Sequence, residues 1–148
     1  MKLTLAILAA AATATADVIQ VTSLTTRTFA RPETNVTRID FTITDIREGQ
    51  NGVTTKCSTA WNVGEDSSEY WYPCDDRAFT FNFPQGIADV SEFDLAARHG
   101  DFEGEARLSS HVGTAIWGCR TPGGTVGVIE QCGLLSDAKV YLQDYANI

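Results

Sequence analysis

Beyond its first 16 residues, the sequence contains no apolar run long enough to cross a lipid bilayer. A spanning helix needs roughly 20 consecutive apolar residues, whereas polar and apolar residues alternate through most of the remaining chain. The opening segment has Lys2, a short apolar run from Leu3 to Ala12, and a small-residue cleavage site at Ala14-Thr15-Ala16. This order is typical of a secretory signal peptide. We therefore predict a signal peptide over residues 1–16, one secreted domain over 17–148 and no membrane segment.

Basic residues are few and scattered along the chain. There are 11 Lys and Arg against 19 Asp and Glu, and no three basic residues stand in a row. Without Lys2 the basic count falls to 10, which gives the mature chain a formal charge of about −9. Binding to a phosphate backbone or an anionic membrane needs clustered Lys and Arg. The sequence therefore predicts no nucleic-acid partner and no membrane partner.

Metal-binding cysteine motifs are also missing. No CxxC occurs, and neither His99 nor His111 stands at ligand spacing from a cysteine, so we predict no metal and no cofactor. The four cysteines of the chain are Cys57, Cys74, Cys119 and Cys132. An even number of cysteines in an exported chain indicates two disulfides, for which three connectivities are open. Sequential pairing closes two short loops worth roughly 3 kcal/mol each, and it joins neighbouring strands without crossing the chain.

Helical periodicity is nearly absent, and alternation with a period of two takes its place. Apolar and polar residues alternate in TRIDFTITD, residues 37–45, and again in AFTFNF, residues 78–83. This pattern is typical of a strand with one buried face. Turn sequences such as Gln50-Asn51-Gly52 and Pro122-Gly123-Gly124 separate candidate strands. We predict an all-β fold, a compact antiparallel barrel or sandwich of about 7–10 short strands.

The stretch CSTAWNVGEDSSEYWYPC, residues 57–74, has an acidic, serine-rich centre with aromatic residues on both sides. If its end cysteines are joined, antiparallel pairing places Thr59 opposite Tyr72, and Trp61 opposite Tyr70. The sequence thus predicts a stapled hairpin whose acidic tip projects into water. An aromatic patch that binds a ligand is the alternative for these rings.

Motifs for catalysis are missing as well. No GxSxG elbow occurs, and no free cysteine is left to pair with a histidine once the disulfides form. The adjacent carboxylates of Glu65-Asp66 and of Asp75-Asp76 point to opposite faces of a strand, so neither pair flanks one scissile bond. The acids of DFEGE, residues 101–105, share a face if extended, but such carboxylates are more often solvated than bound to calcium. We predict that the protein is not an enzyme and has no catalytic residue.

Asn35 is the one candidate for glycosylation. Asn35-Val36-Thr37 is the only Asn-x-Ser/Thr sequon in the sequence, and it lies between Pro32 and the strand expected around Ile39. Such sequons are acceptor sites in secreted proteins. Modification of Asn35 is therefore a prediction for this chain.

Several short motifs follow one another in a distinctive order. The first half contains CSTAW, an acidic stretch, WYPC and AFTFNF, and the second half contains GCRTPGG, EQCG and DAKVYLQ. Together they resemble the core of the Alternaria major allergen family, which includes secreted fungal elicitors and effectors of plant-associated species. The resemblance covers most of the mature chain. It is best over residues 39–83 and 117–142, and weak over 84–114.

The resemblance implies a compact β-barrel with disulfides Cys57–Cys74 and Cys119–Cys132 and no catalytic centre. It also implies a location outside the cell, in the plant apoplast or the fungal cell wall. In some members an extra cysteine near the mature N-terminus joins a dimer. This sequence has none over residues 17–56, so it is expected to be a monomer or a non-covalent homodimer.

The function that the resemblance implies is that of a non-enzymatic fungal effector or elicitor that binds host plant defence proteins and modulates immunity. For some members the partner is a thaumatin-like pathogenesis-related protein. The alternative is a carrier of small phenolic ligands of the flavonoid type, which the allergen is reported to bind. Trp61, Trp71 and Trp117 are the candidate aromatics for lining such a ligand cleft in the barrel or at a dimer interface.

Overall fold

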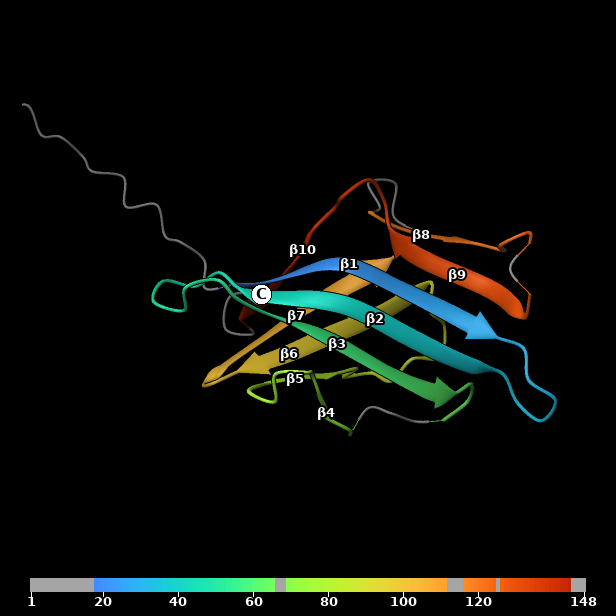
Figure 1. Ribbon diagram of the computed structural model, residues 1–148, viewed down its shortest axis with the longest axis horizontal. Coiled ribbons are helices and arrows are strands. Elements are labelled where there is room, and N and C mark those ends of the chain that lie inside the picture. Colours follow the sequence, from blue (N-terminus) through green and yellow to red (C-terminus); the bar gives the residue numbers. More distant parts are fainter. Residues whose placement is uncertain (1–17, 66–68, 112–115, 125, 145–148) are drawn as a thin grey trace, which may run out of the picture.

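The computed structural model describes residues 18–65, 69–111, 116–124 and 126–144, which form ten β-strands (Figure 1). The strands are β1 (Val18–Phe29), β2 (Val36–Asp45), β3 (Val53–Asn62), β4 (Tyr72–Pro73), β5 (Phe79–Asn82), β6 (Glu92–His99), β7 (Phe102–Ser109), β8 (Trp117–Arg120), β9 (Val128–Leu134) and β10 (Val140–Asp144). All pairs of neighbouring strands are antiparallel. Among the described residues no helix could span a membrane. The predicted all-β class is confirmed.

The alternating sequence segments form strands with one buried face. The inward side chains in β2 and around β5 are the expected ones, namely Ile39, Phe41, Ile43, Phe79, Phe81 and Phe83. None of them is more than 3 % exposed, and full burial of such a side chain stabilises the fold by about 1.5–3 kcal/mol. Phe41 and Phe81 meet edge to face, with ring centres 5.0 Å apart. The core is therefore rich in aromatic contacts between strands that are distant in sequence.

One long sheet folds back on itself into two walls. Its strand order is β3-β2-β1-β10-β7-β6-β5-β4, and Figure 1 shows β1, β2 and β3 in front of β6 and β7, which cross behind them. Along one edge, β1 pairs with β10 over Val18–Val21 and with β9 over Thr25–Phe29. Between these segments lies a bulge at which Ser23 takes a φ of 54°. The β8–β9 hairpin thus extends the front wall.

The disulfide between Cys57 and Cys74 joins the two ends of this sheet. Cys57 lies in β3, and Cys74 follows directly after β4, the last strand in the order. Beside the disulfide, the backbone N–H of Asp75 donates to the Lys56 carbonyl at 2.9 Å. We name residues 55–57 together with residues 74–76 the barrel seam. The seam closes the walls into a nearly complete barrel.

The hairpin predicted over residues 57–74 is wrong, although its disulfide forms. β3 pairs with β2 over its whole length, and β4 pairs with β5. Thr59 and Trp61 therefore lie opposite residues of β2, and Tyr72 lies opposite Phe81, so neither of the two predicted cross-strand pairs forms. The tight connection at residues 46–52 gives β3 a neighbouring partner in β2. Residues 66–68 of the expected acidic tip lie outside the described residues.

Gly104 permits the close approach of β10 to β7. A Cβ at this position would stand 2.8 Å from the carbonyl oxygen of Leu142 and 2.9 Å from the Phe102 ring. We expect Gly104→Ala to lower the free energy of unfolding by about 1–3 kcal/mol, because the added methyl group forces the strands apart. Urea unfolding of Gly133→Ala is the control, since a Cβ at Gly133 would meet nothing closer than 3.6 Å. Equal losses in the two variants would contradict this role.

Candidate functional site

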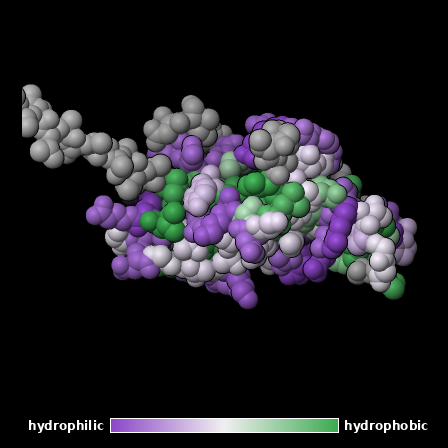
Figure 2. Space-filling view, turned by 90° about the horizontal axis from the view of Figure 1, so that it is seen from above, coloured by the Kyte–Doolittle hydropathy of each residue, from purple (hydrophilic) through white to green (hydrophobic). Residues whose placement is uncertain are grey.

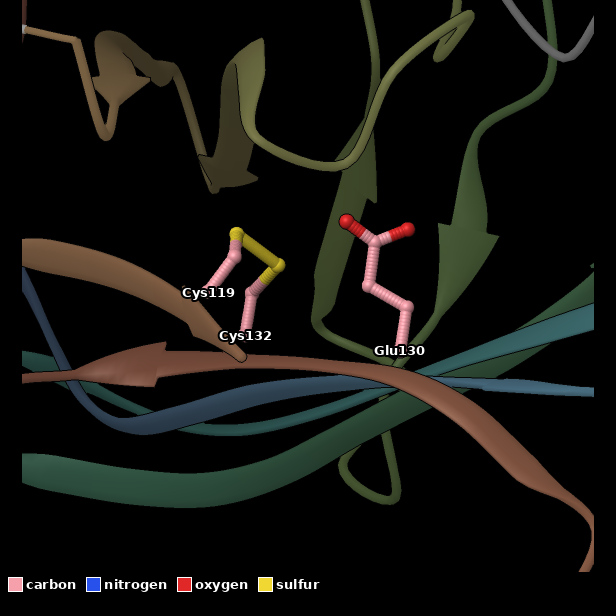
Figure 3. Close-up of side chains that lie close together, drawn as sticks. All are labelled: Cys119, Glu130 and Cys132. Carbon is pink, nitrogen blue, oxygen red and sulfur yellow. A yellow bond between two sulfur atoms is a disulfide. The ribbon is translucent and has the colours of Figure 1, made fainter. Parts of the chain in front are cut away.

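Both disulfides form with the pairing that the resemblance implied. Cys119 and Cys132 face each other across β8 and β9 and are bonded, as are Cys57 and Cys74, so none of the four cysteines is free. Figure 3 shows the side chain of Glu130 on the same side of β9 as the Cys119–Cys132 disulfide. A carboxylate oxygen and the two sulfurs lie within 4.8 Å of one another. Thiolates are the form of cysteine that binds metals, so this group is a disulfide with a neighbouring carboxylate and not a zinc site.

The three candidate tryptophans do not form one site. Trp61 and Trp117 are 5 % and 1 % exposed and belong to the core. The indole N–H of Trp117 donates to the Val90 carbonyl at 2.9 Å. Trp71 lies under Arg98, whose guanidinium carbon is 3.7 Å from the ring centre. The structure therefore does not bring the three rings together in a ligand cleft.

A buried charge cluster joins the end of β2 to the turn between β6 and β7. Asp45 is fully buried, and its carboxylate accepts a hydrogen bond from Arg47 at 2.7 Å and lies 2.6 Å from His99 Nδ1. Arg47 also donates to the His99 carbonyl at 3.1 Å. His99 stacks on Phe79 with ring centres 3.9 Å apart, and the Arg47 guanidinium lies over the Phe102 ring. The cluster binds three separate segments of the chain to one another.

The pKa of the Asp45 carboxyl is lower than its ordinary value. Burial acts to raise this pKa, but the hydrogen bonds from Arg47 and His99 outweigh the burial and lower it. Asp45 is thus an ionised carboxylate whose charge is satisfied inside the fold. His99 is the last residue of β6. Its contacts indicate a structural role.

His111, the second histidine, contacts a serine. The Oγ of Ser91 lies 3.1 Å from His111 Nε2. Asp89 accepts the backbone N–H of Ser91 at 2.8 Å, and hydrogen bonding to Ser91 holds the pKa of the Asp89 carboxyl below its ordinary value. In a nucleophilic triad the carboxylate instead orients the other ring nitrogen of the histidine. This group therefore has the geometry of a hydrogen-bonded turn before β6.

Asn35 lies half-buried between β1 and β2. Its carbonyl accepts the backbone N–H of Val63 at 2.8 Å. Thr37, the third residue of the sequon, is 2 % exposed, and its Oγ1 lies 2.9 Å from Thr28 Oγ1. The sequon threonine is thus buried against a neighbouring strand, and glycosylation of Asn35 stays a prediction.

Among the described residues, five of the nine exposed large apolar side chains belong to β9, β10 and the segments beside β8 and β9. Figure 2 shows hydrophobic residues gathered among hydrophilic ones on the face that lies uppermost in Figure 1, where β8, β9 and β10 are found. The exposed apolar residues of these strands and the segments beside them are Ile116, Val126, Ile129, Leu135 and Tyr141. Groups of exposed apolar residues mark sites of contact with other proteins. We name these five residues the apolar face.

No family model, no curated protein and no solved structure matches this chain. The resemblance to the Alternaria major allergen family therefore rests on the motifs quoted above.

Proposed function

We propose that this chain is a secreted, non-enzymatic effector or elicitor that acts in the plant apoplast by binding a host defence protein. The observation that carries the proposal is the apolar face on a barrel held by two disulfides. Binding that needs little ordering of the surface loses little conformational entropy. A nearly closed, cross-linked scaffold that displays apolar side chains suits such binding.

Two further features support a role outside the cell. The N-terminal segment has the order of a signal peptide, and disulfides persist in oxidising extracellular spaces. The short motifs shared with the Alternaria major allergen family support the choice of a host plant protein as the partner. A thaumatin-like pathogenesis-related protein is the first candidate to test.

The alternative function, a carrier of small phenolic ligands, has less support. The barrel core around Trp61 and Trp117 is filled by side chains in contact, such as Phe83 against Trp61 and Phe93 against Trp117. A ligand at either ring would have to displace these neighbours. Protein binding through the outer surface needs no such rearrangement.

Affinity capture tests the proposed function. Mature protein, residues 17–148, is immobilised and exposed to apoplastic fluid of several plant hosts, and the retained proteins are identified by mass spectrometry. The control is the same protein after reduction and alkylation of its four cysteines, which removes the fold but keeps the composition. We expect one host protein to be retained by the folded form alone. Retention of the same proteins by both forms, or of none in any host, would overturn the proposal.

A further inference from the structure

Strand pairing places three arginines in one row across the front wall. Arg27 of β1 lies opposite Arg38 of β2 on one side and opposite Gln131 of β9 on the other. Gln131 in turn lies opposite Arg120 of β8. Neighbouring strands are about 4.8 Å apart, so the row extends roughly 14 Å from the first strand to the last. We name Arg38, Arg27 and Arg120 the arginine row.

The arginine row faces outward. Its three side chains are exposed, whereas Thr26 and Thr28, on either side of Arg27, are buried. Successive residues of a strand point to opposite faces, so the arginines lie on the face of β1 and β2 turned away from β6 and β7. This face looks toward the viewer in Figure 1.

Two of the three guanidinium groups have no anionic partner among the described residues. Asp40 accepts two hydrogen bonds of 2.8 Å from the Arg38 guanidinium. Arginines elsewhere in the fold also have acidic partners, as in the pairs Arg47–Asp45, Arg98–Glu103 and Arg107–Glu92. Within the part of the chain that the structure describes, no ion pair or hydrogen bond involves the side chain of Arg27 or Arg120. Like charges on directly opposite strands destabilise a sheet. An excess of positive charge is thus concentrated here in a chain of net charge −8.

A hollow lies beside the arginine row. Gly118 and Gly133 face each other across β8 and β9, and without side chains they leave a depression of about 420 Å³. Leu135 forms one wall, since a Cβ on Gly118 would stand 2.9 Å from its Cδ2. Arg120 and Gln131 also line the depression. The Arg120 guanidinium and the apolar wall of Leu135 therefore line the same surface depression, and Arg27 lies opposite Gln131, another residue of its lining.

We infer that the arginine row and this hollow bind an acidic, extended segment of a partner protein, with carboxylates on Arg27 and Arg120 and an apolar side chain against Leu135. Guanidinium groups bind carboxylates with paired, charge-assisted hydrogen bonds. A polysaccharide or a nucleic acid has no apolar side chain for the hollow, and a long polyanion is repelled by the net charge of −8. The inference rests on the proposed function, because it gives the chemistry of the host-protein segment.

The test uses a fluorescent synthetic peptide of alternating glutamate and leucine and the folded mature protein at low salt. Arg27→Gln/Arg120→Gln is the test variant, and Arg77→Gln/Lys139→Gln removes two exposed positive charges elsewhere. We expect the peptide to bind the parent saturably and the test variant about tenfold or more weakly, with the control variant within about twofold of the parent. Unchanged circular dichroism and urea midpoints verify that both variants fold.

Three results would overturn the inference. The first is that the peptide does not bind the parent saturably. The second is that the control variant loses as much peptide affinity as the test variant. The third is that an oligogalacturonate binds the parent as tightly as the peptide does, which would assign the arginine row to an acidic polysaccharide. Affinity capture separates this inference from the proposed function. If the captured host protein binds the test variant as tightly as the parent, the host-protein function stands and the arginine row is not its surface. If no host protein is captured while peptide binding depends on the row, the proposed function fails and the carboxylate site stands.

Discussion

Replacing both Cys57 and Cys74 by serine will lower the free energy of unfolding by about 3 kcal/mol or more and will make the chain sensitive to protease. The chain-entropy model gives about 3 kcal/mol for a loop of this size, and the sequence separation is 17 residues. The larger consequence is structural, because this disulfide joins β3 to β4, the two ends of the sheet. Without it, the described seam residues keep the hydrogen bonds from Asp75 N–H to the Lys56 carbonyl and from Asp76 N–H to Thr55 Oγ1, and the edges of both strands become more accessible.

Cys119→Ser/Cys132→Ser is the matched comparison for this prediction. Its loop of 13 residues has a similar entropic value, but β8 and β9 are already paired directly as a hairpin. We expect a comparable loss in urea unfolding but slower cleavage in limited proteolysis than for the seam variant. Faster cleavage of the hairpin variant would contradict the closing role of Cys57–Cys74. If the seam variant loses partner binding, we expect that loss to result from its unfolding.

Asp45→Asn will lower the free energy of unfolding by about 3 kcal/mol at neutral pH. The carboxylate is fully buried and contacts both Arg47 and His99. Its neutral replacement removes the charged hydrogen bonds that Asp45 makes to Arg47, whose side chain is only 17 % exposed. Asp40→Asn is the matched control, because Asp40 pairs with an arginine at the exposed surface and such pairs contribute about 0–1 kcal/mol.

The same residue predicts a dependence of stability on pH. The pKa of Asp45 is lower in the folded protein than its ordinary value of 3.8, so the unfolded chain binds the proton more tightly. The carboxylate therefore stabilises the fold above about pH 4, and this contribution is lost as the pH falls through the folded-state pKa. Urea midpoints measured from about pH 7 down to about pH 2 should fall less for Asp45→Asn than for the parent. Parallel profiles would show that Asp45 does not cause the acid sensitivity.

Local patterns in the sequence were sufficient to predict the strands and the buried phenylalanines. Alternation with a period of two depends only on which face of a strand is buried, and it holds for β2 and β5 in the folded protein. Which strands pair with one another depends instead on the tertiary fold. The hairpin predicted over residues 57–74 is therefore wrong, because β3 pairs with β2. The Cys57–Cys74 disulfide, which the resemblance implied, reaches across to the other end of the sheet.

The arginine row and the buried cluster could not be found by inspecting runs of residues. Basic residues are scattered in the sequence, and only the register of β2, β1, β9 and β8 aligns Arg38, Arg27 and Arg120. One signal was present, because Arg27 and Arg38 stand at equal distances from the middle of the β1–β2 connection. Asp45 and His99 are 54 residues apart and meet through the packing of two walls. No local pattern indicates such a contact.

The most direct test of a binding function is to titrate the captured host protein with the folded mature protein. The host protein is then recovered from the mixture and its mass is measured. We expect saturable binding by the folded form, no binding by the reduced and alkylated form, and a partner that is recovered with its mass unchanged. A partner recovered cleaved or chemically altered, or one that binds both forms equally, would contradict a protein that acts by presenting the surface of a nearly closed barrel.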